Sequence, residues 1–520
     1  MHLAALGLPE ELLTLIPRAV TSVVWPAPLG TTLLVSANGV TQADAQSLAT
    51  GIGSDGRYIF FISTADNLGG GTAGLFQVYR HDNSTGLTDL ASVGDDHLPG
   101  NQSCVGGTCS SDGLHVAFLS GASNIVAGIP AEDSEVYVHD MVSGANHVAS
   151  VYDGTTTPAS DASDQSMSGD GSRVAFTSSD AAMVAGLTGL RLRVFLHDSI
   201  SGATKLISSS TLGADATDGS DYAAVSSDGT HVAFDSGATN LVTAASNGKL
   251  QVFVKNVATG DIKLASSTST GTQGNNDSAL LTVSSVNQAE PAAVSSDGTY
   301  VAFTSKATNL VTGGNGQQHV YRKNVTTGDI QIVSQVETAP DVWTQGNGAS
   351  NAPSISADGR YVAFVSKATN LVTPSTDVGS QHVYVRDMTT GAVQLASVST
   401  AGVRGAGASL APLISSNGKV LAFSSDAANL VVSDTNSARD AFLHVLGTQT
   451  GLVGDVNGDG VVDINDLATM INEWKTRARD PYTSYVATGG NTINADINGD
   501  GKLNRDDVQL LLDKLLPLGL

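Results

Sequence analysis

Charged residues are scarce in this chain of 520 residues, at 14% of the total, and basic residues are scarcer still, with 25 Lys and Arg against 49 Asp and Glu. The net charge of −24 argues against nucleic acid and anionic membrane surfaces as partners, because both are bound through basic patches. No apolar run approaches the roughly 20 residues that cross a bilayer, so we expect no membrane insertion. A hydrophobic content of 41% is still ample for a packed core, which excludes disorder as the main state.

Cysteine is nearly absent. Cys104 and Cys109 are the only two, which excludes a disulfide scaffold and a four-cysteine zinc site. Their spacing fits a local disulfide in an oxidising compartment, and it fits equally well two reduced, half-buried cysteines on one strand.

Glycine is abundant, at 57 residues, and part of it falls in a repeat. An Asp-Gly dipeptide recurs every 57 to 69 residues, with Asn-Gly as the seventh copy, and a phenylalanine follows six residues after each Asp or Asn. The first residues of these dipeptides are Asp55, Asp112, Asp170, Asp228, Asp297, Asp358 and Asn417. Seven copies in one register indicate a repeat architecture.

Each copy contains four short alternating segments, for example at 353–359, 361–366, 382–387 and 393–399. Asp-Gly and Thr-Gly between such segments are typical of hairpin turns, because glycine supplies the positive φ that these turns require. Four antiparallel strands in each of seven copies predict an all-β, seven-bladed β-propeller.

The two ends of the array predict how the ring closes. The seventh copy ends near residue 447 without a fourth strand, and residues 31–39 resemble the fourth strand of another copy, at 394–402. We therefore expect the N-terminal strand to complete the last blade, which would remove the open sheet edges of an incomplete ring.

The block SxDGxxVAFxSxAxNLV followed by VYVRDxxTG resembles the TolB-like propeller repeat of many bacterial exported proteins, over residues 31–447. The chain departs from the common repeat in its longer blades and in lacking a proline between Ser and Asp-Gly. The resemblance implies a fold rather than a function, because propellers serve as enzymes, binding proteins and scaffolds.

Two segments near the C-terminus, DVNGDGVVDIND at 455–466 and DINGDGKLNRDD at 496–507, match the calcium-loop rule. The rule asks for oxygen ligands at positions 1, 3, 5, 9 and 12, glycine at 6 and a backbone carbonyl at 7. The sequence therefore predicts two Ca²⁺ ions. The expected ligands are Asp455, Asn457, Asp459, Val461, Asp463 and Asp466 in the first loop, and Asp496, Asn498, Asp500, Lys502, Asn504 and Asp507 in the second.

Aspartate at position 12, no entering helix before the first loop and a helix-like pattern after each loop resemble a type I dockerin, over residues 454–518. The resemblance implies a small all-α calcium-binding domain whose partner is a cohesin. Positions 10 and 11 of the loops, which carry much of the partner choice in such domains, are Ile464-Asn465 and Arg505-Asp506. The alternative is a calcium-folded tail that anchors or protects the C-terminus.

The sequence thus divides into an N-terminal segment (1–30), a propeller (31–447) and a dockerin-like domain (448–520). Calcium loops of this class suit extracellular calcium concentrations, so we expect an extracellular or cell-surface bacterial protein. No signal peptide is recognisable, because the first 20 residues lack a basic region and Pro9 with two following glutamates interrupts their apolar run.

Candidate functional residues in the propeller are harder to select. The variable loops, above all 267–291 together with Trp343 and Arg404, mark the face where a ligand is expected. Trp343 fits either a sugar-stacking platform or an aromatic packed beneath its own loop. His81, His139 and His197 precede aspartates, but Lys255, Lys323, Arg386 and His444 hold the same repeat position. We therefore interpret this position as a solvated strand residue rather than a catalytic dyad.

Other polar positions are interpreted structurally. His319 and His382 share a polar strand start with Gln77, Glu135, Arg193 and Gln251. The Asn of AxNLV, in six blades, is expected to bind backbone groups (Asn67, Asn124, Asn240, Asn309, Asn370 and Asn429). The SDTNSARD segment, with Asp434, Asn436 and Asp440, is interpreted as a turn rather than a cation site.

No GxSxG, HExxH or phosphate-loop motif is present. No acid pair distinguishes itself among the loop aspartates Asp161, Asp164, Asp215, Asp218, Asp221 and Asp277.

The leading hypothesis is an exported propeller that binds a polysaccharide or protein ligand and docks to a larger assembly. The alternatives are a polysaccharide hydrolase or lyase, for which no catalytic set can be named, and a structural cell-surface spacer.

Overall fold

The computed structural model describes residue 25 and residues 27–447, except 73, 130–133, 159–160, 244–246, 279–291, 340–341 and 373–378. It also describes the backbone of a short antiparallel pair, β33 (Tyr485–Val486) and β34 (Lys502–Leu503). Apart from Lys502, the predicted calcium ligands lie outside the described residues, as do the helices expected after each loop. Within the described residues, no helix is long and apolar enough to span a membrane.

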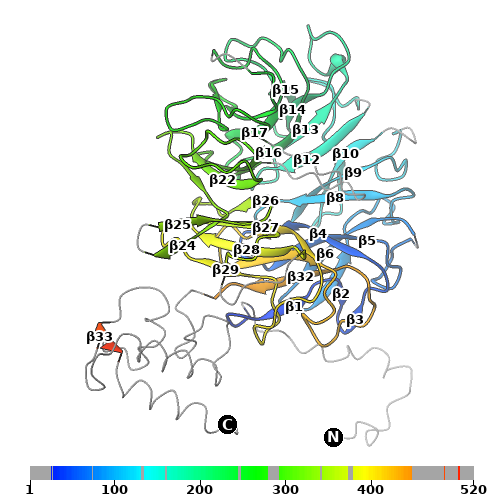
Figure 1. The fold of residues 1–520 in the computed structure, drawn as a ribbon. Coiled ribbons are helices and arrows are strands. Elements are labelled where there is room, and N and C mark those ends of the chain that lie inside the picture. Colours follow the sequence, from blue (N-terminus) through cyan, green and yellow to red (C-terminus); the bar gives the residue numbers. More distant parts are fainter. Residues whose placement is uncertain are drawn as a thin grey trace, which may run out of the picture.

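Seven four-stranded antiparallel sheets form the blades of a propeller, which confirms the predicted fold (Figure 1). Blade 1 consists of β4 (Ser47–Ile52), β5 (Tyr58–Ser63), β6 (Gln77–Asp82) and β7 (Leu87–Leu90). Blade 2 consists of β8 (Cys104–Cys109), β9 (His115–Ser120), β10 (Glu135–Asp140) and β11 (Asn146–Val148). Blade 3 consists of β12 (Ala162–Met167), β13 (Arg173–Ser178), β14 (Arg193–Asp198) and β15 (Ala203–Leu206), with a short 3-10 helix at Ala181–Met183.

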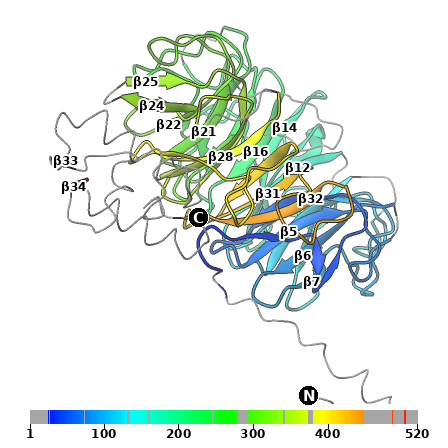
Figure 2. The ribbon, with the colours of Figure 1, turned by 60° about the horizontal axis from the view of Figure 1, so that its bottom comes forward.

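The remaining blades repeat this order (Figure 2). Blade 4 consists of β16 (Ser220–Val225), β17 (His231–Ser236), β18 (Gln251–Asn256) and β19 (Ile262–Leu264). Blade 5 consists of β20 (Ala293–Val294), β21 (Tyr300–Ser305), β22 (His319–Asn324) and β23 (Ile330–Ile332). Blade 6 consists of β26 (Ser350–Ile355), β27 (Tyr361–Ser366), β28 (His382–Asp387) and β29 (Val393–Leu395). Blade 7 consists of β30 (Ser409–Ile414), β31 (Val420–Ser425), β32 (Asp440–Val445) and, as its outermost strand, β1 (Thr32–Leu34).

The N-terminal strand closes the ring, as the sequence predicts. β1 pairs antiparallel with β32, placing Thr32 opposite His444 and Leu34 opposite Phe442. On the inner side, β30 of blade 7 packs against β4 of blade 1, just as the first strands of the other blades pack against their neighbours. The first and last blades are thus joined at both the inner and the outer edge.

The Asp-Gly turns form a second closed circle. The backbone N–H of Ser54 donates to the carbonyl of Ser111, Ser111 donates to Gly169, and the same relay continues from blade to blade. It ends where Asn417 N–H donates to Ser54 O, at 3.4 Å. The glycine of the turn is needed for close packing: a Cβ added to Gly113, whose φ is 69°, would lie 2.6 Å from the Tyr58 ring of the preceding blade.

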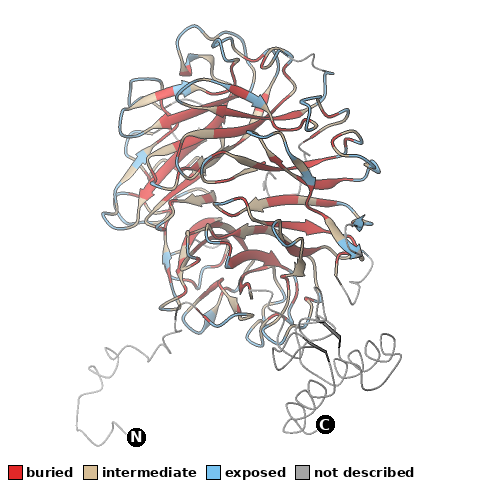
Figure 3. Ribbon diagram, turned by 90° about the vertical axis from the view of Figure 1, so that its left-hand side faces the viewer, coloured by how far each residue is buried: buried red, intermediate tan, exposed pale blue. Residues whose placement is uncertain are grey.

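The repeated phenylalanine explains the core of each blade. In every blade it stacks on an aromatic ring of the third strand, with ring centroids 5.4 to 5.9 Å apart; Phe61 on Tyr79 and Phe423 on Phe442 are the first and last of these pairs. Buried residues are concentrated on the second and third strands of the blades. Figure 3 shows buried stretches along strands throughout the propeller.

A short hairpin follows the outermost strand of every blade, and we call it the clasp. The clasps are held by β2 (Ala37–Asn38) with β3 (Thr41–Gln42), by β24 (Gln335–Ala339) with β25 (Val342–Gln345), and by the bridges Val93–Pro99, Val151–Pro158, Ser209–Asp215, Ser267–Gln273 and Val398–Arg404. The repeated Asn of the next blade binds the last residue of the clasp: Asn240 Nδ2 donates to Asp215 O, at 2.8 Å, and Asn429 Nδ2 to Arg404 O, at 2.8 Å. The predicted backbone-binding role is confirmed, but the bonded carbonyls lie in the clasp of the preceding blade rather than in the loop after the second strand, so the Asn joins neighbouring blades.

Candidate functional site

The third-strand position shared by four histidines, two lysines and an arginine is buried, so its interpretation as solvated is wrong. His81, His139, His197, Lys255, Lys323, Arg386 and His444 are all between 3% and 6% exposed. The alternating pattern of a single strand could not reveal this, because the clasp of the preceding blade covers the position.

The two lysines and the arginine donate hydrogen bonds directly to the preceding blade or its clasp. Lys255 Nζ contacts Ser209 O at 2.7 Å, and Lys323 Nζ contacts Ser267 O at 3.1 Å. Arg386 Nη1 donates to Ile332 O, at 2.7 Å. These bonds satisfy carbonyl groups that burial would otherwise leave without a partner.

The histidines reach the preceding clasp through an intermediate side chain. Thr88 donates its hydroxyl proton to Ala37 O, so its oxygen accepts from His81 Nδ1, at 2.9 Å. An equivalent series of hydrogen bonds links His444 through Thr32 to Val398 O, with His444 Nδ1 2.9 Å from Thr32 Oγ1. Burial lowers the pKa of both imidazoles to about 4. The seven side chains at this position form a buried circle of hydrogen-bond donors that links each blade to the preceding clasp or blade.

The residues that begin the third strand form a second buried ring. Gln77, Glu135, Arg193, Gln251, His319 and His382 are at most 1% exposed. Several bind a serine on the outermost side of their own blade: Ser92 Oγ donates to Gln77 Oε1, at 2.6 Å, and His319 Nδ1 lies 2.9 Å from Ser334 Oγ. They are polar strand starts, as expected, but packed inside the blade.

Of the loop aspartates, the structure brings Asp164 and Asp221 together. They lie on the innermost strands of blades 3 and 4, and the carboxyl of Asp164 is hydrogen-bonded to that of Asp221. Asp164 occupies a β-bulge of β12 and has a φ of 43°. Tyr222, which follows Asp221 on β16, lies in a second bulge and has a φ of 53°. Bulges of this kind re-aim side chains and are frequent beside functional sites.

Asp235, which sequence reasoning missed, is the cross-strand partner of Asp221. It is 2% exposed, its Oδ1 atom has no hydrogen-bond partner, and burial raises its pKa. Burial and the Asp221 carboxyl raise the pKa of Asp164 to about 8, so this pair shares a proton at neutral pH. Two carboxyls in direct contact are closer than the roughly 5 Å or more between the acids of a glycosidase.

The other candidate aspartates have structural partners or stand apart from this pair. Asp215 forms ion pairs with Arg193, at 3.0 Å, and Arg191, at 3.4 Å. Asp277 accepts from Leu250 N–H, and Asp218 from Gly219 N–H. Asp161 lies outside the pair, in a left-handed backbone conformation with φ of 59°.

The SDTNSARD segment is a turn that secures the N-terminal clasp. Gln42 Nε2 donates to Asp434 and to Asp440, at 3.0 Å each, and Asn436 Nδ2 donates to Ala43 O, at 2.8 Å. In the part of the chain that the structure describes, no group of three His, Cys, Asp or Glu side chains is arranged to hold a metal ion.

Cys104 and Cys109 are separate thiols, which favours two reduced cysteines on one strand over a local disulfide. They stand at opposite ends of β8, and five residues of strand span about 16 Å, beyond the reach of a disulfide. Burial raises the pKa of Cys104 to about 11 and that of Cys109 to about 12, so neither is a thiolate at neutral pH.

Trp343 covers the next blade rather than its own loop. Its side chain is 39% exposed and lies over the Arg386 guanidinium, 4.5 Å from ring centroid to Cζ. An added Cβ on Gly391, in the β28–β29 turn, would lie 2.4 Å from the indole ring. Segment 279–291 of the long inter-blade connection lies outside the described residues.

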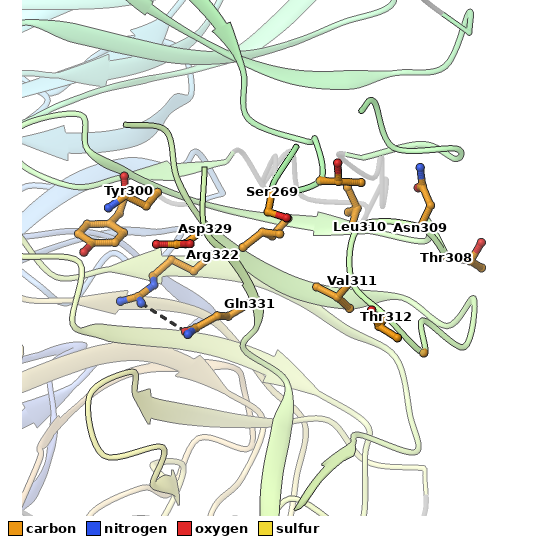
Figure 4. A pocket seen from close by; sticks show the side chains of 14 residues that line it. Ser269, Tyr300, Thr308, Asn309, Leu310, Val311, Thr312, Arg322, Asp329 and Gln331 are labelled. Carbon is orange, nitrogen blue, oxygen red and sulfur yellow. Dashed lines mark hydrogen bonds between the residues drawn. The ribbon is translucent and has the colours of Figure 1, made fainter. Parts of the chain in front are cut away.

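A groove of about 710 Å³ lies along blade 5 (Figure 4). Tyr300, Arg322 and Gln331 gather at one end of it, and Thr308 and Thr312 at the other. Arg322 Nη1 donates to Gly359 O, at 2.6 Å, and its guanidinium stacks 4.6 Å from the centroid of the Tyr300 ring. Hydroxyl, amide and charged groups dominate the lining, which suits a hydroxyl-rich ligand.

Comparison with known proteins identifies the C-terminal region. Residues 453–516 match the family described as Dockerin type I domain. No curated protein matches the chain.

Solved structures similar to the chain are distant. TolB from Acinetobacter baumannii is 13% identical, with a TM-score of 0.35, over 67% of this chain and 65% of that one, just under two thirds of its length. An oligogalacturonate lyase in complex with manganese is 13% identical, with a TM-score of 0.46, over 80% of this chain and 96% of that one. The β-propeller domain of the Trilobed protease from Pyrococcus furiosus is 9% identical, with a TM-score of 0.45, over 77% and 95%.

These similarities are of fold, and none of them bears on what this chain binds. The chain is a seven-bladed β-propeller with TolB-like structural neighbours, and it carries a dockerin type I domain at residues 453–516.

Proposed function

We propose that this protein is an exported, calcium-binding propeller that docks through its dockerin domain to a cohesin and presents the propeller to a polysaccharide or protein ligand. The observation that carries the proposal is the dockerin type I match at 453–516, because such domains bind cohesins in general. In this arrangement the propeller spans residues 31–447, the docking module 448–520, and the N-terminal segment 1–30.

Two Ca²⁺ ions order the docking module in this account. The ligands are the six residues of each loop, from Asp455 to Asp466 and from Asp496 to Asp507. The ions neutralise clustered carboxylates, and because such a site does not exist in the unfolded chain, the binding free energy contributes directly to folding. The need for extracellular calcium concentrations supports a position outside a bacterial cell or on its surface.

Calorimetric titration of the full chain with a panel of purified cohesins tests this function. We expect one or more cohesins to bind in calcium and not in EDTA. The double variant Asp466→Ala, Asp507→Ala removes position 12 of both loops and should abolish binding, while Asp480→Ala, outside both loops, should not. Binding that persists unchanged in EDTA, or no binding to any cohesin, would overturn the docking proposal.

A polysaccharide hydrolase or lyase is the second candidate. Asp164 and Asp221 are too close together to act as the two separate acids of a glycosidase, but the Asp164 carboxyl, which is buried and keeps its proton at neutral pH, can serve as a single general acid. An enzyme would be established if the wild type, with calcium present, releases new reducing ends from plant, algal or microbial polysaccharides and the Asp164→Asn variant does not. Binding without turnover would favour the first proposal, and neither binding nor turnover would favour a structural spacer.

A further inference from the structure

Blades 1 and 5 carry an arginine at the same position of the third strand. Arg80 and Arg322 both stack on the tyrosine that begins the second strand of their own blade, with Cζ 4.7 Å from the centroid of the Tyr58 ring and 4.6 Å from that of Tyr300. Both also donate through Nη1 to the carbonyl of the Asp-Gly glycine in the next blade, Gly113 or Gly359. The chain therefore contains two copies of one arginine site.

The two copies differ in their cross-strand partner. Arg80 pairs in register with Asp89, and its Nη2 forms an ion pair with that carboxylate at 2.8 Å. Arg322 pairs in register with Gln331, whose amide oxygen lies 3.4 Å from Nη2. Among the described residues Arg322 has no ion pair. Asp358 interacts with its charge electrostatically but is not in ion-pair contact with it. Blade 5 thus keeps the arginine and lacks the anion that neutralises it in blade 1.

This charge lies in the groove along blade 5 (Figure 4). Ser269 Oγ, the Tyr300 hydroxyl, Thr312 Oγ1 and the Gln331 amide nitrogen also line it and make no hydrogen bond to another described residue. Asp329 adds a carboxylate that can accept from hydroxyl groups while also accepting from Thr327 Oγ1, at 2.7 Å. A half-buried guanidinium with no ion pair among the described residues favours an anion, and hydroxyl and amide groups that none of those residues bind favour a polyhydroxyl framework.

We infer that the groove along blade 5 binds an anionic oligosaccharide, whose acidic group replaces at Arg322 the carboxylate that Asp89 supplies to Arg80. The inference rests on the proposed function, in which the propeller carries the ligand, and it names the site and the class of ligand. A carboxylate of a uronic acid and a sulfate ester share the required chemistry.

Titration of the full chain, with calcium present, against oligosaccharides of equal length tests the inference. The probes are an oligomer of a uronic acid, a sulfated oligomer and a neutral oligomer. We expect at least one acidic oligomer to bind about tenfold or more tighter than the neutral one, with affinity that falls as salt is added. The acidic oligomer that binds identifies the anionic group.

Three variants locate the site. Gln331→Asp should install the blade 1 ion pair in blade 5 and weaken binding of the acidic oligomer about tenfold or more, and Arg322→Gln should do the same. Arg80→Gln removes the matched arginine of blade 1 and should leave the affinity within about twofold. Because residue 331 is exposed, Gln331→Asp should not change the melting temperature.

Equal affinity for neutral and acidic oligomers, no binding of any acidic oligomer, or binding that Gln331→Asp leaves unchanged would overturn the inference. Cohesin titration of the same preparations separates this failure from failure of the proposed function. If the protein binds a cohesin in calcium but shows no preference for acidic oligomers, the docking proposal stands and only the proposed ligand site in the groove is rejected. If the wild type binds no cohesin, the docking proposal itself is rejected.

Discussion

Lys255 of blade 4 donates hydrogen bonds from Nζ to the backbone carbonyl and the hydroxyl of Ser209, at 2.7 and 2.5 Å, where the clasp of blade 3 begins. A side chain at the same position reaches back from every other blade. These contacts join neighbouring sheets that share no backbone hydrogen-bond ladder, and so they hold the ring together beyond the packing of its apolar faces.

Replacing Lys255 by Met should destabilise the propeller while keeping most of the apolar stem. The carbonyls of Ser209 and Ser210 would lose a donor in a buried place, which costs about 1–3 kcal/mol in the free energy of unfolding. Denaturation in guanidinium chloride measures the loss. Lys205→Met, an exposed lysine on β15, is the matched control and should change stability little. Equal effects of the two substitutions would show that the clasp contact is unimportant.

Acid should weaken the closure of the ring through His81 and His444, because His81 is linked through Thr88 to Ala37 of β2 and His444 contacts Thr32 of β1. Burial lowers the pKa of each folded imidazole from 6.5 to about 4. Between these values the unfolded chain binds more protons than the folded one, so stability falls as the pH is lowered from about 6.5 to about 4, on the order of 3 kcal/mol per imidazole.

Thermal melting of the wild type and of His81→Gln and His444→Gln over this range provides the measurement. The variants should lose less stability on acidification, whereas His97→Gln, at an exposed clasp residue, should behave as the wild type. Burial raises the pKa of Asp440 to about 6, so this residue makes stability rise as the pH is lowered. The histidine effect is therefore measured as the difference in stability between each variant and the wild type at the same pH. Parallel pH profiles would contradict the closure role.

The repeat predicts the seven blades and the closing strand well, because turn chemistry and alternation are local. The Asp-Gly or Asn-Gly glycine and the phenylalanine that follows mark every blade in sequence, and the turn glycines adopt the expected positive φ. The prediction that His81 and Lys255 are solvated is wrong because the groups that cover them belong to the preceding blade. One signal was available: the position holds only side chains that can donate from nitrogen.

The acid pair could not be selected from sequence for a related reason. Asp164 and Asp221 are 57 residues apart and meet only because bulges on two innermost strands re-aim them. Asp235 looks like an ordinary strand residue, and only its register opposite Asp221 reveals it. Arg322 is likewise distinguished from Arg80 by one cross-strand neighbour, which becomes visible once the register is known.

Asp164→Asn should stabilise the propeller at alkaline pH. The folded pKa of Asp164 is raised from 3.8 to about 8, so between these values the folded chain binds more protons and stability falls as the pH rises. Asparagine tolerates the left-handed conformation and can donate to Asp221 without a proton from solvent. We expect the stability gain to grow by about 3–4 kcal/mol between pH 5 and pH 8, as measured by guanidinium denaturation. A gain independent of pH, or a loss, would contradict the proton-sharing pair.

Removal of calcium should unfold the docking module and leave the propeller folded. In the proposed function the ions contribute most of the folding free energy of the two loops, whereas no group of three acidic, His or Cys side chains in the described propeller is arranged for a metal. Calorimetry should show two transitions in calcium, with the transition of residues 454–520 lost in EDTA and that of the propeller unmoved. A single transition unaffected by EDTA would reject this division.

The most direct test of the whole account joins the two units in one measurement. A cohesin that binds the chain is immobilised, the full-length protein is added, and polysaccharides are then passed over the surface in calcium or in EDTA. We predict that a polysaccharide is retained only when both the protein and calcium are present, and that EDTA releases protein and polysaccharide together. Retention of the protein in EDTA, or no retained polysaccharide from a broad panel while the protein stays bound in calcium, would contradict a propeller that presents its ligand through a calcium-dependent dockerin.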